Sequence, residues 1–281
     1  MGTRPLALIL WIVAGCLVGS GVPMARAATN LQFVTTAGGQ PDDITTDAQG
    51  RLVWGDLAAG TIKRFDGRRV RVVVRGLSVP EGVVALGNGS LVVAEQGSDR
   101  IVQINKRGRM TVLYRLHPVP GQDGVDGMHL DARTHTLLIA DSPRGTVLRL
   151  NIRSRTARVV ATGLGRPVDA VAAGNGDILI PDEHLGTVVV VTPRGRVSYR
   201  GTFATPDDVA VDGSGRVWVT TLGDGGLWVI APGSAPRRVL AGLANPQGLT
   251  LDRCGDPIIV EQNTARIVRL LLTAKSSRCA L

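Results

Sequence analysis

The stretch PDDVAVDGSGRVWVTT, residues 206–221, is one of six variants of a single phrase along the chain. It opens with a proline and carboxylates, continues as an alternating apolar run, turns at glycine and ends in a second apolar run, which predicts a β-hairpin. The other copies are PDDITTDAQGRLVWGD from Pro41, PEGVVALGNGSLVVAE from Pro80, VDGMHLDARTHTLLIAD from Val125, PVDAVAAGNGDILIPD from Pro167 and PQGLTLDRCGDPIIVE from Pro246. Successive starts are 39, 45, 42, 39 and 40 residues apart, a spacing typical of β-propeller blades.

Each repeat reads as four strands. In the first repeat the runs ITTD, RLVWGD, TIKRFD and RVRVVV follow one another with turn residues between them. Their branched side chains suit a pleated, half-buried surface, and sheets with two apolar faces must stack on one another. The sequence therefore predicts an all-β, six-bladed propeller of four-stranded blades, formed by residues 28–281 as a single domain.

The sixth repeat offers only three strands, GLTLD, PIIVE and RIVRLLL, before the tail TAKSSRCAL. The missing strand is at the other end of the chain, because LQFVTTAGGQPDD has the same phase as VVVRGLSVPEG. We expect residues 31–36 to complete the last blade, which joins the two ends of the propeller and removes exposed sheet edges.

Residues 1–27 resemble a secretory signal. A single positive charge, an apolar run over residues 5–22 and Ala25–Ala27 are typical of a segment cleaved after Ala27. An uncleaved membrane span is one alternative, and lipidation of Cys16, preceded by Val13-Ala14-Gly15, is another. We favour cleavage, because glycines interrupt the apolar run and the residues after Cys16 are not a polar tether. In each case the protein is expected outside the cytoplasm.

The chain is strongly basic, with a formal net charge of +9, or +7 without residues 1–27. Secretion and an aromatic content of 3% argue against a nucleic-acid partner, so we expect a monomer that contacts an anionic cell-envelope surface. The arginines that would form this rim lie in the outer strands and their hairpins: Arg68, Arg69, Arg71, Arg75, Arg107, Arg109, Arg153, Arg155, Arg158, Arg194, Arg196, Arg237 and Arg238.

Cys254 and Cys279 are the two cysteines left after removal of the signal. Outside the cytoplasm they are expected to form a disulfide, and closing a loop of this length stabilises the chain by about 3 kcal/mol. A catalytic thiol is less favoured, since no Cys/His arrangement supports it.

The first strand of each propeller blade lines the central channel, so the two positions after each opening residue should ring its mouth. These pairs are Asp42-Asp43, Glu81-Gly82, Asp126-Gly127, Val168-Asp169, Asp207-Asp208 and Gln247-Gly248. Converging carboxylates must raise some pKa values, recruit arginine or bind a cation. The alternative is that these acids are turn residues bonded to nearby backbone. We interpret four later acids as structural in that way: Asp47, Asp131, Asp212 and Asp252.

Further acids end the second strands: Asp56, Glu95, Asp141, Asp182 and Glu261. His184 follows one of these strands, in PDEHLG, and is the histidine that we consider as a general base. A solvated loop histidine is the alternative. His129, inside the first strand of the third repeat, is expected to pack between blades.

The phrases PDDVAVDGSGRVWVT and PEGVVALGNGSLVVAEQGSDRIVQI resemble NHL-repeat propellers and the gluconolactonase (senescence marker protein) superfamily, and more distantly virginiamycin B lyase. The resemblance to gluconolactonases implies one divalent cation in the hub, with an aspartate as both ligand and base. By blade order Asp207 is similar to that aspartate, Asp126 and Asp169 stand where two asparagine ligands would be, and Asp42 replaces a glutamate. Glu95 and Glu261 resemble an acid of the lyase.

Two functional classes follow. One is a secreted or envelope-associated module that binds a small molecule, an envelope polymer or a cation at an acidic mouth. The other is a metal-dependent lactone or ester hydrolase, or a lyase, with Asp207 or His184 as catalytic residue. In both, the predicted ligands of a calcium or magnesium ion are Asp42, Glu81, Asp126, Asp169 and Asp207. We favour the binding module, because three of the enzyme family's ligand positions are changed.

Overall fold

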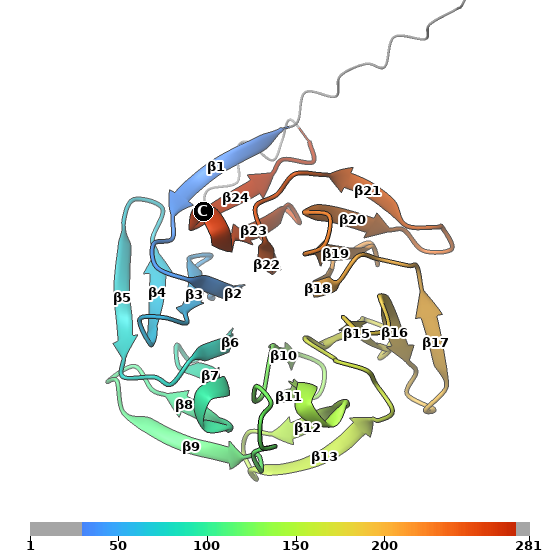
Figure 1. Ribbon diagram of the computed structural model, residues 1–281. Helices are drawn as coiled ribbons and strands as arrows, with labels where there is room; N and C mark the ends of the chain where they lie inside the picture. The colour runs from blue at the N-terminus through green and yellow to red at the C-terminus, as the bar shows by residue number, and fades with distance from the viewer. Residues whose placement is uncertain (1–29, 274–281) are drawn as a thin grey trace, which may run out of the picture.

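The computed structural model describes residues 30–273, which form six four-stranded antiparallel sheets around a central axis (Figure 1). Each sheet runs from an inner strand at the axis to an outer strand at the perimeter. This arrangement confirms the six-bladed propeller predicted from the repeat.

The first three blades consist of β2 (Pro41–Thr46), β3 (Leu52–Asp56), β4 (Thr61–Phe65) and β5 (Val70–Arg75); β6 (Pro80–Ala85), β7 (Leu91–Glu95), β8 (Arg100–Ile104) and β9 (Met110–Arg115); β10 (Met128–Asp131), β11 (Thr136–Asp141), β12 (Thr146–Asn151) and β13 (Thr156–Ala161). The other three consist of β14 (Val171–Ala172), β15 (Ile178–Asp182), β16 (Thr187–Val191) and β17 (Val197–Arg200); β18 (Pro206–Val211), β19 (Val217–Thr221), β20 (Gly226–Ile230) and β21 (Arg237–Leu240); β22 (Pro246–Leu251), β23 (Pro257–Glu261), β24 (Arg266–Leu270) and β1 (Leu31–Thr36). Short 3-10 turns follow three second strands: η1 (Gln96–Ser98), η2 (Ser142–Arg144) and η3 (Gln262–Thr264).

The ring closes through β1, the outer strand of the sixth blade. It pairs antiparallel with β24, with Leu31 opposite Leu270 and Thr36 opposite Arg266. Ala37 N continues the contact by donating to Ala265 O at 2.7 Å. The prediction that residues 31–36 complete the last blade is therefore confirmed.

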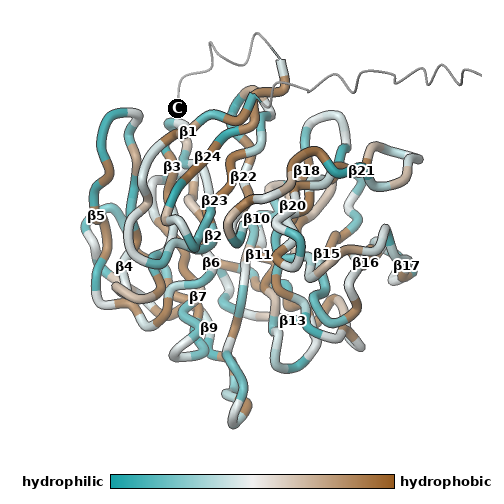
Figure 2. The backbone as a smooth tube through the Cα atoms, turned by 45° about the horizontal axis from the view of Figure 1, so that its top comes forward, coloured by the Kyte–Doolittle hydropathy of each residue, from teal (hydrophilic) through white to brown (hydrophobic). Residues whose placement is uncertain are grey.

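The hydrophobic core lies between neighbouring blades. Every residue of the six second strands is buried. Figure 2 shows apolar stretches along the strands of the blades. Trp54 of the first blade, fully buried, packs in one cluster with Ile258 and Val260 of the sixth. Burial of each such aliphatic side chain stabilises the fold by about 1.5–3 kcal/mol, so adjacent blades stabilise one another.

The acid before the first hairpin turn has a structural role, as predicted. Asp212 Oδ1 accepts hydrogen bonds from Ser214 N at 2.9 Å and Arg216 N at 3.1 Å, and its Oδ2 accepts one from Trp218 Nε1 at 3.1 Å. Burial opposes ionisation, but these donors outweigh it and lower the pKa of Asp212 to about 2. Asp47, Asp131 and Asp252 make equivalent turn contacts.

Two predictions fall outside the described residues. Cys279 and the segment 1–27 are beyond residues 30–273, so the disulfide to Cys254 and the cleavage after Ala27 stay predictions. Within the described part of the chain, no helix has the length and apolar character needed to cross a membrane.

Candidate functional site: the acidic hub

The inner strands begin at the same end of the propeller at which the second strands end. Pro41 pairs with Asp56, Pro80 with Glu95, and Pro246 with Glu261. We call this end the mouth face. The hairpin turns that join first to second and third to fourth strands lie at the opposite end, the turn face.

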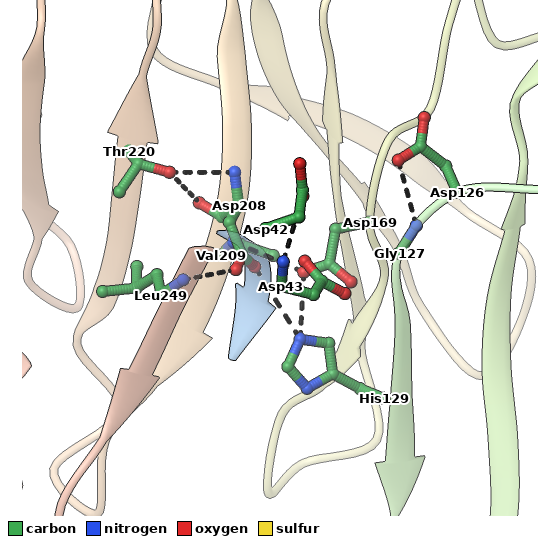
Figure 3. A network of polar contacts seen from close by, with 10 residues as sticks. All are labelled: Asp42, Asp43, Asp126, Gly127, His129, Asp169, Asp208, Val209, Thr220 and Leu249. Atoms are coloured by element: carbon green, nitrogen blue, oxygen red, sulfur yellow. Dashed lines mark hydrogen bonds and ion pairs between the residues drawn. The ribbon is translucent and has the colours of Figure 1, made fainter. Parts of the chain in front are cut away.

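Seven carboxylates from five blades gather at the hub near the mouth face, and they form two groups. The upper ring contains the acids at the first position after the opening residue: Asp42, Glu81, Asp126 and Asp207. The His129 cluster contains the second-position acids Asp43, Asp169 and Asp208 with the imidazole of His129. Figure 3 shows these three carboxylates close to the His129 ring, whereas Asp126 points away from it.

His129 lies within hydrogen-bond distance of a carboxylate from the next blade. Its Nε2 is 3.1 Å from Asp169 Oδ2 and 3.8 Å from Asp208 Oδ1, and its side chain keeps 25% of its surface exposed. The expectation that His129 packs between blades is wrong. The ring borders the hub because its strand, β10, is an inner strand and the neighbouring acids attract a cationic imidazole.

The groups of this cluster shift one another's pKa values. Burial opposes the charge of His129, but Asp169 and Asp208 outweigh it and raise the pKa of the imidazole well above its ordinary value. Burial would raise the pKa of Asp169, yet His129 keeps it below the usual range. Burial and the charge of Asp169 raise the pKa of Asp208. The cluster therefore favours a protonated imidazole beside an ionised Asp169, and it disfavours ionisation of Asp208.

Asp169 and Asp208 also connect successive blades. Asp208 accepts hydrogen bonds from Val209 N at 2.7 Å and, in the next blade, from Leu249 N at 2.5 Å. Asp169 Oδ2 accepts a longer one from Val209 N at 3.4 Å. Asp169 Oδ1 is buried and has no hydrogen-bond partner among residues 30–273. The second-position acids are thus both structural groups and an incompletely satisfied polar site.

Glycine occupies the second position in the other three blades because the neighbouring backbone is too close for a side chain. A Cβ at Gly127 would lie 2.6 Å from Val168 O, and one at Gly248 would lie 2.6 Å from Asp42 O. A Cβ at Gly82 would lie 3.0 Å from Met128 N. Close approach of the inner strands therefore limits second-position carboxylates to the first, fourth and fifth blades.

Two members of the upper ring are held by polar side chains from other blades. Asp42 accepts hydrogen bonds from Asp43 N at 3.0 Å and from Gln262 Nε2 at 2.8 Å, across the seam of the propeller. Asp126 accepts from Ser142 Oγ at 3.2 Å and Arg166 Nη2 at 3.3 Å. Arg166 thus places a positive charge at the mouth.

The other two members differ in how well they are satisfied. In the amide orientation that satisfies its neighbours, the Gln247 side chain donates to both oxygens of Asp207 at 3.2 Å. Glu81 Oε2 is buried and has no hydrogen-bond partner within the described chain.

Burial disfavours ionisation of the carboxyl groups of the upper ring. Burial, reinforced by Asp126, raises the pKa of Asp42 to about 8. Burial also raises the pKa of Asp126 to about 7 although Arg166 opposes the shift. Burial and neighbouring carboxylates raise the pKa values of Glu81 and Asp207 well above their usual range. Near neutral pH the hub therefore retains protons that a bound cation could displace.

The acids that end the second strands are engaged elsewhere. Glu95 accepts from Ser78 N at 2.8 Å and from Arg100 Nε at 2.5 Å, and Glu261 accepts from Ala244 N at 3.0 Å. Glu261 also pairs with an arginine, Arg266, at 2.9 Å. These contacts hold the loop that leads into each inner strand, which gives Glu95 and Glu261 a structural role.

His184 lies outside the hub. It is exposed in the turn between β15 and β16 and lines a pocket of about 450 Å³ on the mouth face, together with Gln122, Ser142 and Arg166. Because Ser142 and Arg166 both contact Asp126, this pocket borders the upper ring. A catalytic role for His184 or Asp207 stays a prediction.

The geometry divides the ligand set predicted from the sequence. Asp42, Glu81, Asp126 and Asp207 belong to the upper ring, and Asp169 belongs to the His129 cluster. Among the described residues, three potential metal-ligating side chains have ligand atoms within 4.8 Å of one another, namely His129, Asp169 and Asp208.

The sequence did not identify His129 as a site residue, although it stands where the other repeats have Thr45, Val84, Val171, Ala210 and Thr250. The feature that could have identified it is a titratable residue at an aligned position where the other five repeats have an apolar residue or a threonine.

No family model and no curated protein matches the chain. Solved structures do. A gluconolactonase from Xanthomonas campestris is 16% identical, with 86% of this chain and 89% of that chain covered and a TM-score of 0.75. Virginiamycin B lyase from Staphylococcus aureus is 17% identical, with 82% and 80% covered and a TM-score of 0.66.

A chain of a nidogen/laminin complex is 18% identical, with 72% of this chain and 79% of that chain covered and a TM-score of 0.63. The fold is thus shared with two enzymes and with a chain from a protein complex, so it does not by itself decide the function. This chain has the six-bladed propeller fold of gluconolactonases and virginiamycin B lyase, as its repeated phrase predicted.

Proposed function

We propose that this protein is a binding module whose hub holds a divalent cation through His129, Asp169 and Asp208. The observation that carries the proposal is the convergence of these three ligand atoms within 4.8 Å of one another. The buried, unpartnered Asp169 Oδ1 supports it, since a cation would satisfy an oxygen that the described chain leaves without a partner.

The donor set fits a divalent cation of a particular kind. Two carboxylates and one imidazole suit manganese or zinc, whereas calcium and magnesium prefer a site made only of oxygen atoms. His129 must lose its proton to become a ligand, so affinity should rise with pH. The upper ring, with four carboxylates and no histidine, supports the alternative of a calcium or magnesium ion nearer the mouth.

Calorimetric titration of metal-depleted protein with Ca²⁺, Mg²⁺, Mn²⁺ and Zn²⁺ tests the site. We expect binding to be lost in Asp169→Asn and His129→Gln and retained in Glu81→Gln, an upper-ring control. The reverse pattern would move the cation to the upper ring. Absence of binding by all four metals would reject a cation site.

The mouth pocket is the proposed ligand site. Arg166 and His184 line it and Asp126 lies beside it, so a polar ligand could meet both donors and a carboxyl group there. We propose a small molecule or the end of an envelope polymer as the ligand. The signal-like segment 1–27 supports a location outside the cytoplasm. Fractionation of cells that express the full chain tests this location.

A metal-dependent lactone or ester hydrolase, or a lyase, is the second candidate. The shared fold with gluconolactonase is consistent with it. The raised pKa of buried Asp207 is the observation that favours it, because such a carboxyl is a stronger base than an ordinary aspartate. Lactone hydrolysis by the wild type and by Asp207→Asn decides the matter. Equal rates would remove Asp207 as the catalytic residue.

A further inference from the structure

Four hairpin turns on the turn face carry an unusual concentration of positive charge. They join the third and fourth strands of blades one to four and span residues 66–69, 105–109, 152–155 and 192–196. Their cations, all exposed and here called the cationic arc, are Arg68, Arg69, Lys106, Arg107, Arg109, Arg153, Arg155, Arg194 and Arg196. One acid, Asp66, lies in these turns.

No residue of the cationic arc forms an ion pair with an acid in the described part of the chain. Asp66 pairs instead with Arg71, at 3.8 Å. On the mouth face, by contrast, Arg100 pairs with Glu95, and Arg266 with Glu261. The four turns, with nine cations and one acid, therefore carry a net charge of +8, compared with +9 for the whole chain.

The arc is held in shape by its turns. Asn105 Oδ1 accepts hydrogen bonds from Arg107 N at 2.9 Å and from Arg109 N at 3.0 Å. Asn151 Oδ1 accepts from Arg153 N at 2.9 Å. The turns lie beside the outer strands β5, β9, β13 and β17, so they follow the perimeter of the propeller (Figure 1). The series ends at the fifth blade, whose turn 231–236, APGSAP, is uncharged.

The N-terminal segment joins the propeller on the same face. β1 begins at Leu31, opposite Leu270 at the turn-face end of β24, and Leu271 N donates to Asn30 O at 2.9 Å. The residues that precede β1 include the apolar run 5–22. An unpaired cationic surface suits an anionic lipid bilayer, and the apolar run adds to this contact only where the chain keeps residues 1–27.

We propose that the turn face docks on a bilayer that contains anionic lipids, with the acidic mouth directed away from the membrane. The turns of the arc contain no exposed large hydrophobic residue, so the contact is electrostatic and weakens with salt. This inference goes beyond the proposed hub site and stands or falls independently of it.

Vesicle flotation of the full chain tests the inference. Phosphatidylcholine vesicles are compared with vesicles that also contain phosphatidylglycerol, and the ratio of the two affinities is recorded, because the apolar run would bind both. The test variant is Arg107→Gln/Arg153→Gln, in two turns of the arc. The control is Arg75→Gln/Arg115→Gln, two exposed arginines that end β5 and β9 at the mouth face and change the net charge equally.

We expect the wild type to prefer the anionic vesicles and the arc variant to lose roughly 25-fold of that preference, about five-fold for each cation near an anionic bilayer. The control should retain it. Equal losses in both variants, or equal wild-type binding to both vesicles, would overturn the inference. So would a pattern in which the arc variant loses binding to soluble heparin but not to anionic vesicles, since that identifies a polyanionic polymer as the partner.

Discussion

His129 Nε2 lies 3.1 Å from Asp169 Oδ2, so a histidine of the third blade and an aspartate of the fourth are joined at the centre of the propeller. Removing the imidazole would leave a buried carboxylate without its cation, which typically costs about 3–5 kcal/mol. Because its raised pKa makes His129 bind its proton more tightly in the folded state, the pair contributes its full stabilisation at pH values below the ordinary histidine pKa of 6.5.

We therefore expect His129→Gln to lower the free energy of unfolding most at pH values below about 6. The difference from the wild type should shrink as pH rises through the raised pKa of the imidazole. Urea unfolding at several pH values measures it. A difference that does not vary with pH would contradict the ion pair.

Asp42 should make stability fall in the same direction as pH rises, over a wider interval. Its pKa rises from 3.8 unfolded to about 8 folded, so the folded state binds the extra proton between these values and stability falls as pH rises through that interval. Asp42→Asn cannot ionise, and we expect it to be more stable than the wild type at about pH 8 by at least 1 kcal/mol. Thermal unfolding across the interval checks the slope, and an unchanged slope would contradict the prediction.

Gly127→Ala should disrupt the contact between the third and fourth blades. The new Cβ would lie 2.6 Å from Val168 O, an oxygen that accepts a hydrogen bond from Gly127 N at 2.8 Å. We expect a loss of about 1–3 kcal/mol of stability. Gly174→Ala is the matched control, because no described atom lies within 4 Å of its Cβ and its stability should change little. Denaturant midpoints compare the two.

The predicted bridge between Cys254 and Cys279 can be tested without knowledge of its geometry. If the bridge forms, Cys279→Ala should lose about 3 kcal/mol of stability. Reductant should lower the free energy of unfolding of the wild type to that of the variant. Thiol titration of the unfolded, unreduced protein provides the direct measurement. In the chain without residues 1–27, which lacks Cys16, two free thiols would show that the bridge is absent.

The repeat determined the architecture because it is a local pattern written six times. Alternating apolar runs and glycine turns specify each hairpin, and a period near forty residues leaves radial stacking as the way to bury both faces of every sheet. The phase of residues 31–36 even identified the strand that closes the ring, since strand pairing follows the same register in each blade.

The composition of the site was decided by the tertiary structure. The sequence indicated that Asp42, Asp126 and Asp207 ring the mouth, because each follows an opening residue of the phrase. It did not indicate that His129 would meet Asp169, because the two residues lie 40 positions apart and belong to different blades. Only the close approach of adjacent inner strands, which Gly127 permits, brings their side chains together.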